Sequence, residues 1–187
     1  DAAYTNKLSS GLGYSLSGQY INVRSVGNAE NKLVQAGSAT GGKKISGNLL
    51  GWKMDISYDE SAFALAYSKV LSDSNRHDSL VLPWDGTPLY TNMITSNDLF
   101  QSNYGKALNA DSIYIGGSEG IKLAYTQKYD FTGINGFKTV FSYLYADNDK
   151  FAHAQRDYNA VIAYGIGNFS LALKGIWVRN NSSQRFS

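Results

Sequence analysis

Charged side chains of this chain fall on the polar positions of segments in which apolar and polar residues alternate. Five are lysines and two are aspartates: Lys53, Asp55, Lys122, Lys128, Asp130, Lys138 and Lys174. Ammonium groups spaced along a water-filled surface attract carboxylates and other small anions. The sequence leaves a second interpretation open, in which these lysines are only solvated or lie near a rim.

Groups for covalent or acid–base catalysis are sparse. The chain contains no Cys and 2 His, and we expect His77 and His153 both to lie in loops. No HExxH-like spacing suggests a metal site. His77, Asp78 and Ser79 are neighbours in the sequence, but a catalytic triad is defined by spatial geometry, and this adjacency is not a known signature. We therefore expect no enzyme activity, no metal site and no cofactor.

The segments that carry the lysines have the period of β-strands. Between residues 121 and 131, Ile121, Leu123 and Tyr125 share one face, whereas Lys122 and Lys128 share the other. Side chains of a strand alternate between faces with period two, so one face is aromatic and aliphatic and the other is charged and polar. A transmembrane barrel and a water-soluble sandwich both show this alternation.

Eight such segments are expected, joined in pairs by short turns. They cover residues 2–8, 14–24, 45–58, 62–71, 121–131, 137–145, 158–166 and 169–179. Longer polar connections at 25–44, about 72–120 and 147–157 separate the pairs. This alternation of short turns and long connections is typical of an antiparallel transmembrane β-barrel, which has short turns at one rim and long loops at the other. We therefore expect an all-β chain, with residues 1–187 forming one portion of a barrel.

The composition supports the membrane interpretation and excludes two other classes. The chain has 14 Tyr, 19 Gly and 2 Pro, which favours strands. No apolar run reaches the roughly twenty residues of a membrane-spanning helix. A formal charge of +2, without dense Lys/Arg runs, excludes a nucleic-acid binder. Aromatic residues that we expect near strand ends, where a bilayer places its interfacial girdles, are Tyr20, Trp52, Tyr58, Tyr67, Tyr145, Tyr158, Tyr164 and Trp177.

Three segments in the middle of the chain carry a family resemblance. They are residues 83–100 (PWDGTPLYTNMITSNDLF), 111–117 (DSIYIGG) and 121–127 (IKLAYTQ). Together they resemble the carboxy-terminal half of OprD-type porins, most nearly the major outer membrane proteins of campylobacter-like bacteria. The resemblance covers nearly the whole chain, and residues 83–100 with the following hairpin are its most specific part.

The resemblance implies a barrel of about eighteen antiparallel strands, often trimeric, that passes small hydrophilic solutes across the bacterial outer membrane. We expect a lipid bilayer, small solutes or ions, and two further copies in a homotrimer as partners. About eight strands are present, so we expect this chain to be part of a larger barrel. The resemblance also implies that the lysines form a basic ladder that guides carboxylates along the pore.

The long connection at about 72–120 has two interpretations. In porins such a loop can fold into the barrel and narrow it, which makes constriction candidates of Asp85, Asn92, Asn97, Asp98 and Tyr104. The loop can equally lie on the surface and face the exterior. A second function also stays open: an outer-membrane structural or adhesin-like barrel, or a soluble sandwich, whose loops bind a partner.

Overall fold

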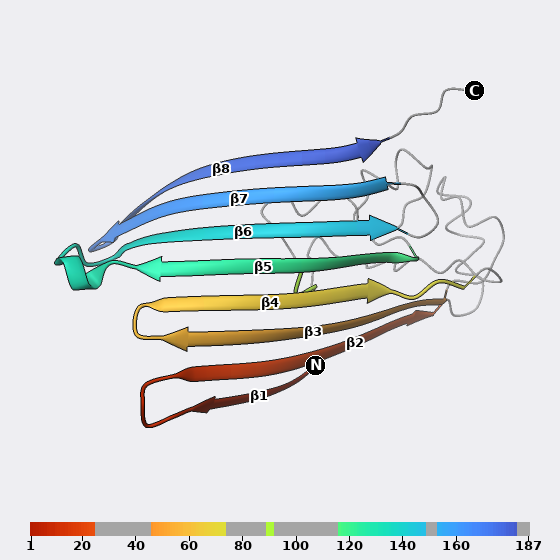
Figure 1. The fold of residues 1–187 in the computed structure, drawn as a ribbon, viewed down its shortest axis with the longest axis horizontal. Helices are drawn as coiled ribbons and strands as arrows, with labels where there is room; N and C mark the ends of the chain where they lie inside the picture. The colour runs from red at the N-terminus through yellow and green to blue at the C-terminus, as the bar shows by residue number, and fades with distance from the viewer. Residues whose placement is uncertain (25–45, 74–88, 92–115, 149–152, 183–187) are drawn as a thin grey trace.

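All the strands of the described part of the chain belong to a single antiparallel sheet. The structure, a computed structural model, describes residues 1–24, 46–73, 89–91, 116–148 and 153–182. Its strands are β1 (Ala2–Lys7), β2 (Gly13–Arg24), β3 (Ser46–Tyr58), β4 (Ser61–Val70), β5 (Ser118–Lys128), β6 (Phe137–Asn148), β7 (His153–Ile166) and β8 (Phe169–Ser182), and a 3₁₀ turn, η1 (Asp130–Thr132), precedes β6. Each strand pairs with the next one in sequence, so the eight strands form a meander (Figure 1). The predicted all-β antiparallel fold is confirmed.

Several strand boundaries differ from those predicted by periodicity, most clearly those of β5, β6 and β7. β5 starts at Ser118 and ends at Lys128, three residues before the predicted boundary at each end. β6 continues to Asn148 and β7 begins at His153, so the predicted connection at 147–157 contains only residues 149–152 and His153 is not in a loop. The polar side chains of this region suggested a loop. Backbone ladder bonds do not depend on side-chain polarity, however, and here they continue through the Asp147–Ala154 pair.

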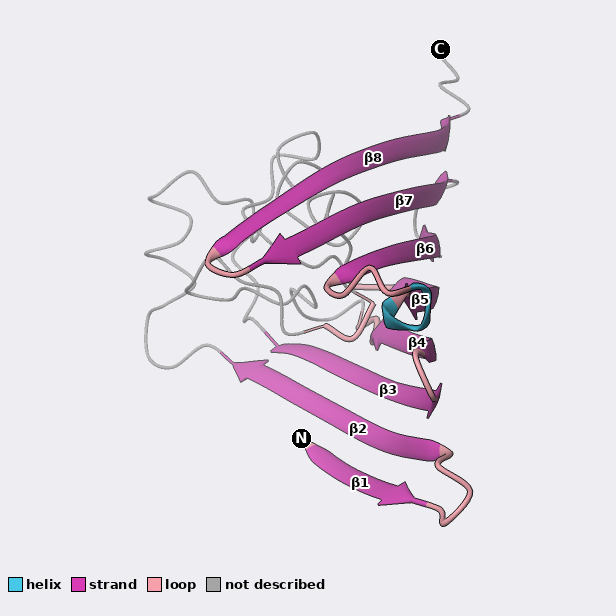
Figure 2. Ribbon diagram, turned by 90° about the vertical axis from the view of Figure 1, so that its left-hand side faces the viewer, coloured by secondary structure: helices cyan, strands magenta, loops and turns pink. Residues whose placement is uncertain are grey.

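The sheet is curved into a trough. Figure 2, which looks roughly along the strands, shows β2 and β8 extending to the same side of the central strands. We call the hollow side the concave face and the other side the convex face. β1 and β8 form the two edges of the described sheet and do not pair with each other. The sheet is therefore an open arc.

Backbone conformation at the turns is set by a few residues with positive φ. Asp59, in the two-residue β3–β4 turn, has a φ of 52°, which aspartate tolerates better than most residues. Gly133 ends η1 with a φ of 80°, as expected for a left-handed cap. The Asp130 Oδ1 atom accepts a hydrogen bond of 3.0 Å from the Gly136 amide nitrogen, which closes this connection. The four short connections, β1–β2, β3–β4, β5–β6 and β7–β8, lie at one edge of the sheet, which we call the short-turn edge.

The two faces differ in composition, as the alternation predicts. Cross-strand partners lie on the same face, so the register assigns every strand residue to one side. The convex face carries large apolar side chains, and the concave face carries small, polar and charged ones. The buried apolar residues of the sheet lie mainly on the concave face near the edge opposite the short turns, and include Leu49, Val70 and Leu144. Within the described ranges, the structure contains no helix of the length and apolarity required to cross a membrane.

Candidate pore-lining face

The register brings six of the seven predicted charged residues together on the concave face. One row of cross-strand partners, the lysine row, includes Lys53, Ala66, Lys122, Leu144 and Asp157. Because neighbouring strands lie about 4.8 Å apart, the backbones at Lys53 and Lys122 are about 10 Å apart. Ala66 between them is nearly fully buried, with 2% of its surface exposed. The two ammonium-bearing side chains therefore flank a small residue on a single level of the trough.

An ion pair connects the lysine row to the next row of partners. The Lys53 Nζ atom lies 2.9 Å from the Asp55 Oδ1 atom, and each side chain keeps about a third of its surface exposed. The Ser15 hydroxyl on β2 donates a 3.2 Å hydrogen bond to the other carboxylate oxygen of Asp55. The concave face therefore carries both signs of charge at this level, and the Asp55 carboxylate is held between two strands.

Two charged residues of the concave face were missed by the sequence prediction. Asp157, which has only 1% of its surface exposed, lies two strands from Lys122 in the lysine row. The sequence prediction placed Asp157 at the end of a loop. Asp157, Asn159 and Val161 are spaced two residues apart, however, and this spacing places all three on one face of a strand. Lys7 at the end of β1 is the other residue, and its partner Gly13 assigns it to the concave face.

The remaining predicted lysines gather near the short-turn edge. Lys128 and Lys138 are direct cross-strand partners, and Lys174 is the partner of Val161 on the same face. Lys7 lies in the same row of partners as Lys174. All four side chains are exposed. The described concave face thus has two levels of positive charge, one at the lysine row and one near the short turns.

Asp130 lies outside the strands. It begins η1, and its carboxylate accepts the turn-closing hydrogen bond from Gly136. The predicted strand continued through Phe131, but the ladder between β5 and β6 ends at the Lys128–Lys138 pair. A role of Asp130 in lining a pore stays a prediction.

One short piece of the long connection belongs to the described structure. Leu89 and Thr91 are buried, with 5% and 1% of their surface exposed. The Tyr90 hydroxyl donates a 3.5 Å hydrogen bond to the carbonyl oxygen of Gly18 on β2. Residues 89–91 therefore lie against the sheet. The constriction candidates Asp85, Asn92, Asn97, Asp98 and Tyr104 lie outside the described residues.

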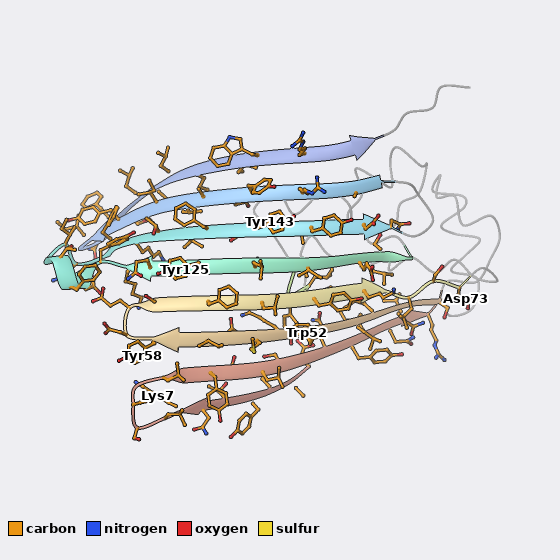
Figure 3. The ribbon with its side chains drawn as sticks, viewed as in Figure 1. Lys7, Trp52, Tyr58, Asp73, Tyr125 and Tyr143 are labelled. Atoms are coloured by element: carbon orange, nitrogen blue, oxygen red, sulfur yellow. The ribbon has the colours of Figure 1, made fainter. Side chains whose placement is uncertain are left out.

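Away from the edge opposite the short turns, the convex face is mainly aromatic and aliphatic. All the aromatic residues predicted to form girdles, from Tyr20 to Trp177, fall on this face. Figure 3, drawn from the convex side, shows Trp52, Tyr125 and Tyr143 along the strands and Tyr58 at the short-turn edge. Cross-strand ring pairs strengthen it: the ring centroids of Trp52 and Tyr67 are 6.3 Å apart, and those of Tyr143 and Tyr158 are 5.0 Å apart.

Known protein families and curated protein sequences offer no match to this chain. Solved structures do match. OpdL from Pseudomonas aeruginosa has a TM-score of 0.70 and 16% identity, with 95% of this chain and 44% of OpdL covered. OccAB4 from Acinetobacter baumannii gives 0.65 and 17%, with coverage of 96% and 40%. P. aeruginosa OpdK, solved with vanillate, gives 0.67 and 12%, with coverage of 96% and 42%.

The chain has the fold of an arc of an OprD/Occ-type β-barrel. It spans less than half the length of each of these structures. Eight strands in 44% of the length is the proportion expected of a barrel of about eighteen strands. The matches show the fold, and the charged concave face is a property of this chain's own sequence.

Proposed function

We propose that this chain forms part of the wall of a porin, a water-filled channel in a bacterial outer membrane through which small hydrophilic solutes and ions diffuse passively. The observation that carries the proposal is the position of the charged residues on the two faces. On the concave face they include mid-strand residues such as Lys53 and Lys122, whereas on the convex face of the described strands they occur only near the edge opposite the short turns. Eight charged residues of the described strands lie on the concave face: Lys7, Lys53, Asp55, Lys122, Lys128, Lys138, Asp157 and Lys174. A lysine that faces lipid at the bilayer midplane costs roughly 2–4 kcal/mol, so water on the concave side explains this placement.

The balance of charge favours anions. The concave face of the described strands carries six lysines and two aspartates, and one of these aspartates is paired with Lys53. A wet passage lined with excess positive charge raises the local concentration of anions. OpdK, solved with the carboxylate vanillate, supports a preference for small organic carboxylates. The lysines then act as the predicted ladder.

The soluble alternative is disfavoured by the convex face. On β8, Phe169, Leu171 and Leu173 are 80%, 75% and 71% exposed, and the convex faces of β3 to β7 continue this apolar surface. Soluble monomers rarely expose a contiguous apolar patch larger than a few hundred Å². A bilayer would cover it. A conductance measurement distinguishes a channel from an adhesin-like barrel of the same fold.

The test is a planar-bilayer recording of the complete protein that carries this chain, with the reversal potential measured under a salt gradient. We expect stable conductance steps and a reversal potential that indicates selectivity for anions. The variant Lys122→Gln/Lys128→Gln/Lys138→Gln should shift the reversal potential in the direction of cation selectivity. Lys69→Gln, on the convex face, is the control and should not shift it. Unchanged selectivity in the triple variant would overturn the ladder, and absence of steps would favour the adhesin-like barrel.

Three finer expectations stay predictions. They are the homotrimer, the narrowing of the pore by Asp85, Asn92, Asn97, Asp98 and Tyr104, and the specific likeness to proteins of campylobacter-like bacteria. The burial of Leu89 and Thr91 against the sheet supports an inward course for one part of the long connection. Cross-linking of the membrane-embedded protein would test the trimer, because a closed trimer gives a limiting band at three subunits.

A further inference from the structure

Charged residues on the convex face are confined to one end of the strands. Within the described strands they are Arg24, Lys69, Glu119, Asp147, Arg156 and Arg179, which we call the outer charged band. Each lies within four residues of a strand end at the edge opposite the short turns. The short-turn end of the same face carries Tyr58, Phe137 and Tyr164 instead. The two ends of the convex face therefore meet different chemical surroundings.

Arg156 and Arg179 are the unusual members of this band. They are direct cross-strand partners on β7 and β8, and like charges placed directly opposite each other destabilise a sheet. Lys69 is paired with Glu119 at 3.1 Å, whereas neither arginine has a carboxylate partner among the described residues. The Arg156 guanidinium lies 5.8 Å from the centre of the Tyr145 ring, which holds it at the surface. An external anion bound between the two arginines would offset their repulsion.

An apolar groove begins next to this pair, toward the short-turn edge. Its volume is about 380 Å³, and its lining includes Phe63, Leu123, Phe141, Tyr158, Ala160 and Trp177. Tyr158 and Trp177 are two positions from Arg156 and Arg179 along the same strands, so they share the convex face with the arginines. Ala160, whose cross-strand partner is Gly175, is a small residue among the larger side chains that line the groove. The Trp177 ring bounds it by leaning over Gly175, where a Cβ atom would lie 2.7 Å from the ring.

We propose that the Arg156–Arg179 pair and this groove together form a binding site for a phosphorylated, acylated glycolipid of the lipid A class. Arginine forks match phosphate oxygens in bidentate geometry, and the groove accepts part of an acyl chain. The inference rests on the proposed function, because the long connections of an outer-membrane barrel face the exterior and place the outer charged band in the outer leaflet. A phosphate lies at the headgroup level of that leaflet, above the acyl chains, as the arginines lie above the groove.

The test is native mass spectrometry of the complete protein in detergent, titrated with bisphosphorylated lipid A and with its dephosphorylated form. Each cation near an anionic lipid surface contributes about fivefold in affinity, so Arg156→Gln/Arg179→Gln should weaken binding of the phosphorylated form by about 25-fold. The dephosphorylated lipid should bind equally to both proteins. Ala160→Leu, which fills the groove, should weaken binding of both lipids.

The matched control is Lys128→Gln/Lys138→Gln, which removes a second like-charged cross-strand pair from the concave face and should leave lipid affinity unchanged. Arg156→Lys/Arg179→Lys keeps the charge and should recover part of the affinity. Equal losses in the arginine and lysine variants, or displacement of the lipid by inorganic phosphate alone, would overturn the site. The conductance of the unmodified protein is recorded on the same preparation. Conductance steps without lipid binding would overturn only this inference. Absence of conductance steps would overturn the proposed function.

Discussion

Because Gly136 has no side chain, two neighbouring hairpins can pack closely against each other at this residue. Its φ is 80°, and its carbonyl oxygen accepts a 3.1 Å hydrogen bond from the Gly165 amide nitrogen at the end of the neighbouring hairpin. A Cβ atom at Gly136 would lie 2.3 Å from the Gly165 carbonyl oxygen. The turn after β5 and the last residues of β7 are therefore packed backbone to backbone.

We expect Gly136→Ala to destabilise the protein more than Gly133→Ala. Both glycines have a φ of 80°, but a Cβ atom at Gly133 meets nothing within 4 Å. The left-handed conformation costs about 1–2 kcal/mol in either variant, and the backbone clash at Gly136 should add about 1–3 kcal/mol. The midpoints of thermal unfolding in detergent should fall in that order. Equal unfolding midpoints for the two variants would show that moving the Gly136 turn away from its neighbour costs no free energy.

At the scale of the strands, the assignment of faces is the feature on which the function depends. Leu123 on β5 lies on the convex face between Leu65 and Tyr143. Its sequence neighbour Ala124 lies on the concave face between Ala64 and Ser142. The two positions are at the same depth along the strand, so they differ only in what each face contacts.

Leu123→Lys should therefore lower the free energy of unfolding in lipid vesicles by roughly 2–4 kcal/mol, because the ammonium group would face acyl chains near mid-depth. Ala124→Lys is the matched variant, and a wet concave face should tolerate it with a change of less than about 1 kcal/mol. Urea titration of the vesicle-embedded protein measures both. The reverse order would mean that lipid covers the concave face.

At the scale of the whole molecule, the described strands form an arc whose two edges, β1 and β8, do not pair with each other. β8 is 14 residues long, and its Phe169, Leu171 and Leu173 are 71–80% exposed, whereas the most exposed large apolar side chain of the doubly paired strands, Ile166, is 62% exposed. Long apolar edge strands offer unpaired backbone groups to other chains, and only a closed barrel satisfies these groups inside a bilayer.

The 187-residue chain by itself should therefore give no stable conductance steps, whereas the complete protein that carries it should. The expected behaviour of the isolated chain is association through β1 and β8, visible as oligomers in detergent by light scattering. Both preparations are compared in planar bilayers at the same protein concentration. Stable steps from the isolated chain would indicate that several copies close a barrel together.

The sequence determined the local features of this protein. Period-two alternation predicted the hairpins, and it assigned Lys53, Lys122 and Lys138 to one face and the girdle aromatics to the other. These features depend only on neighbouring residues along a strand, because the direction of a side chain is fixed by its own backbone. The predicted end of β6 and the predicted start of β7 were wrong because polar residues such as Asp157 occupy these strands. The polarity of a side chain indicates contact with solvent, but it does not determine where the backbone hydrogen bonds of a sheet end.

The tertiary structure decided which residues of different strands meet. β4 and β5 are separated by the connection at 71–117, so the sequence carries no local signal for the register that places Lys122 two strands from Lys53. The same holds for the Arg156–Arg179 pair, because register depends on backbone pairing across strands. Curvature is likewise a property of the assembled sheet, and it turns two faces of alternating residues into the inside and the outside of a barrel wall.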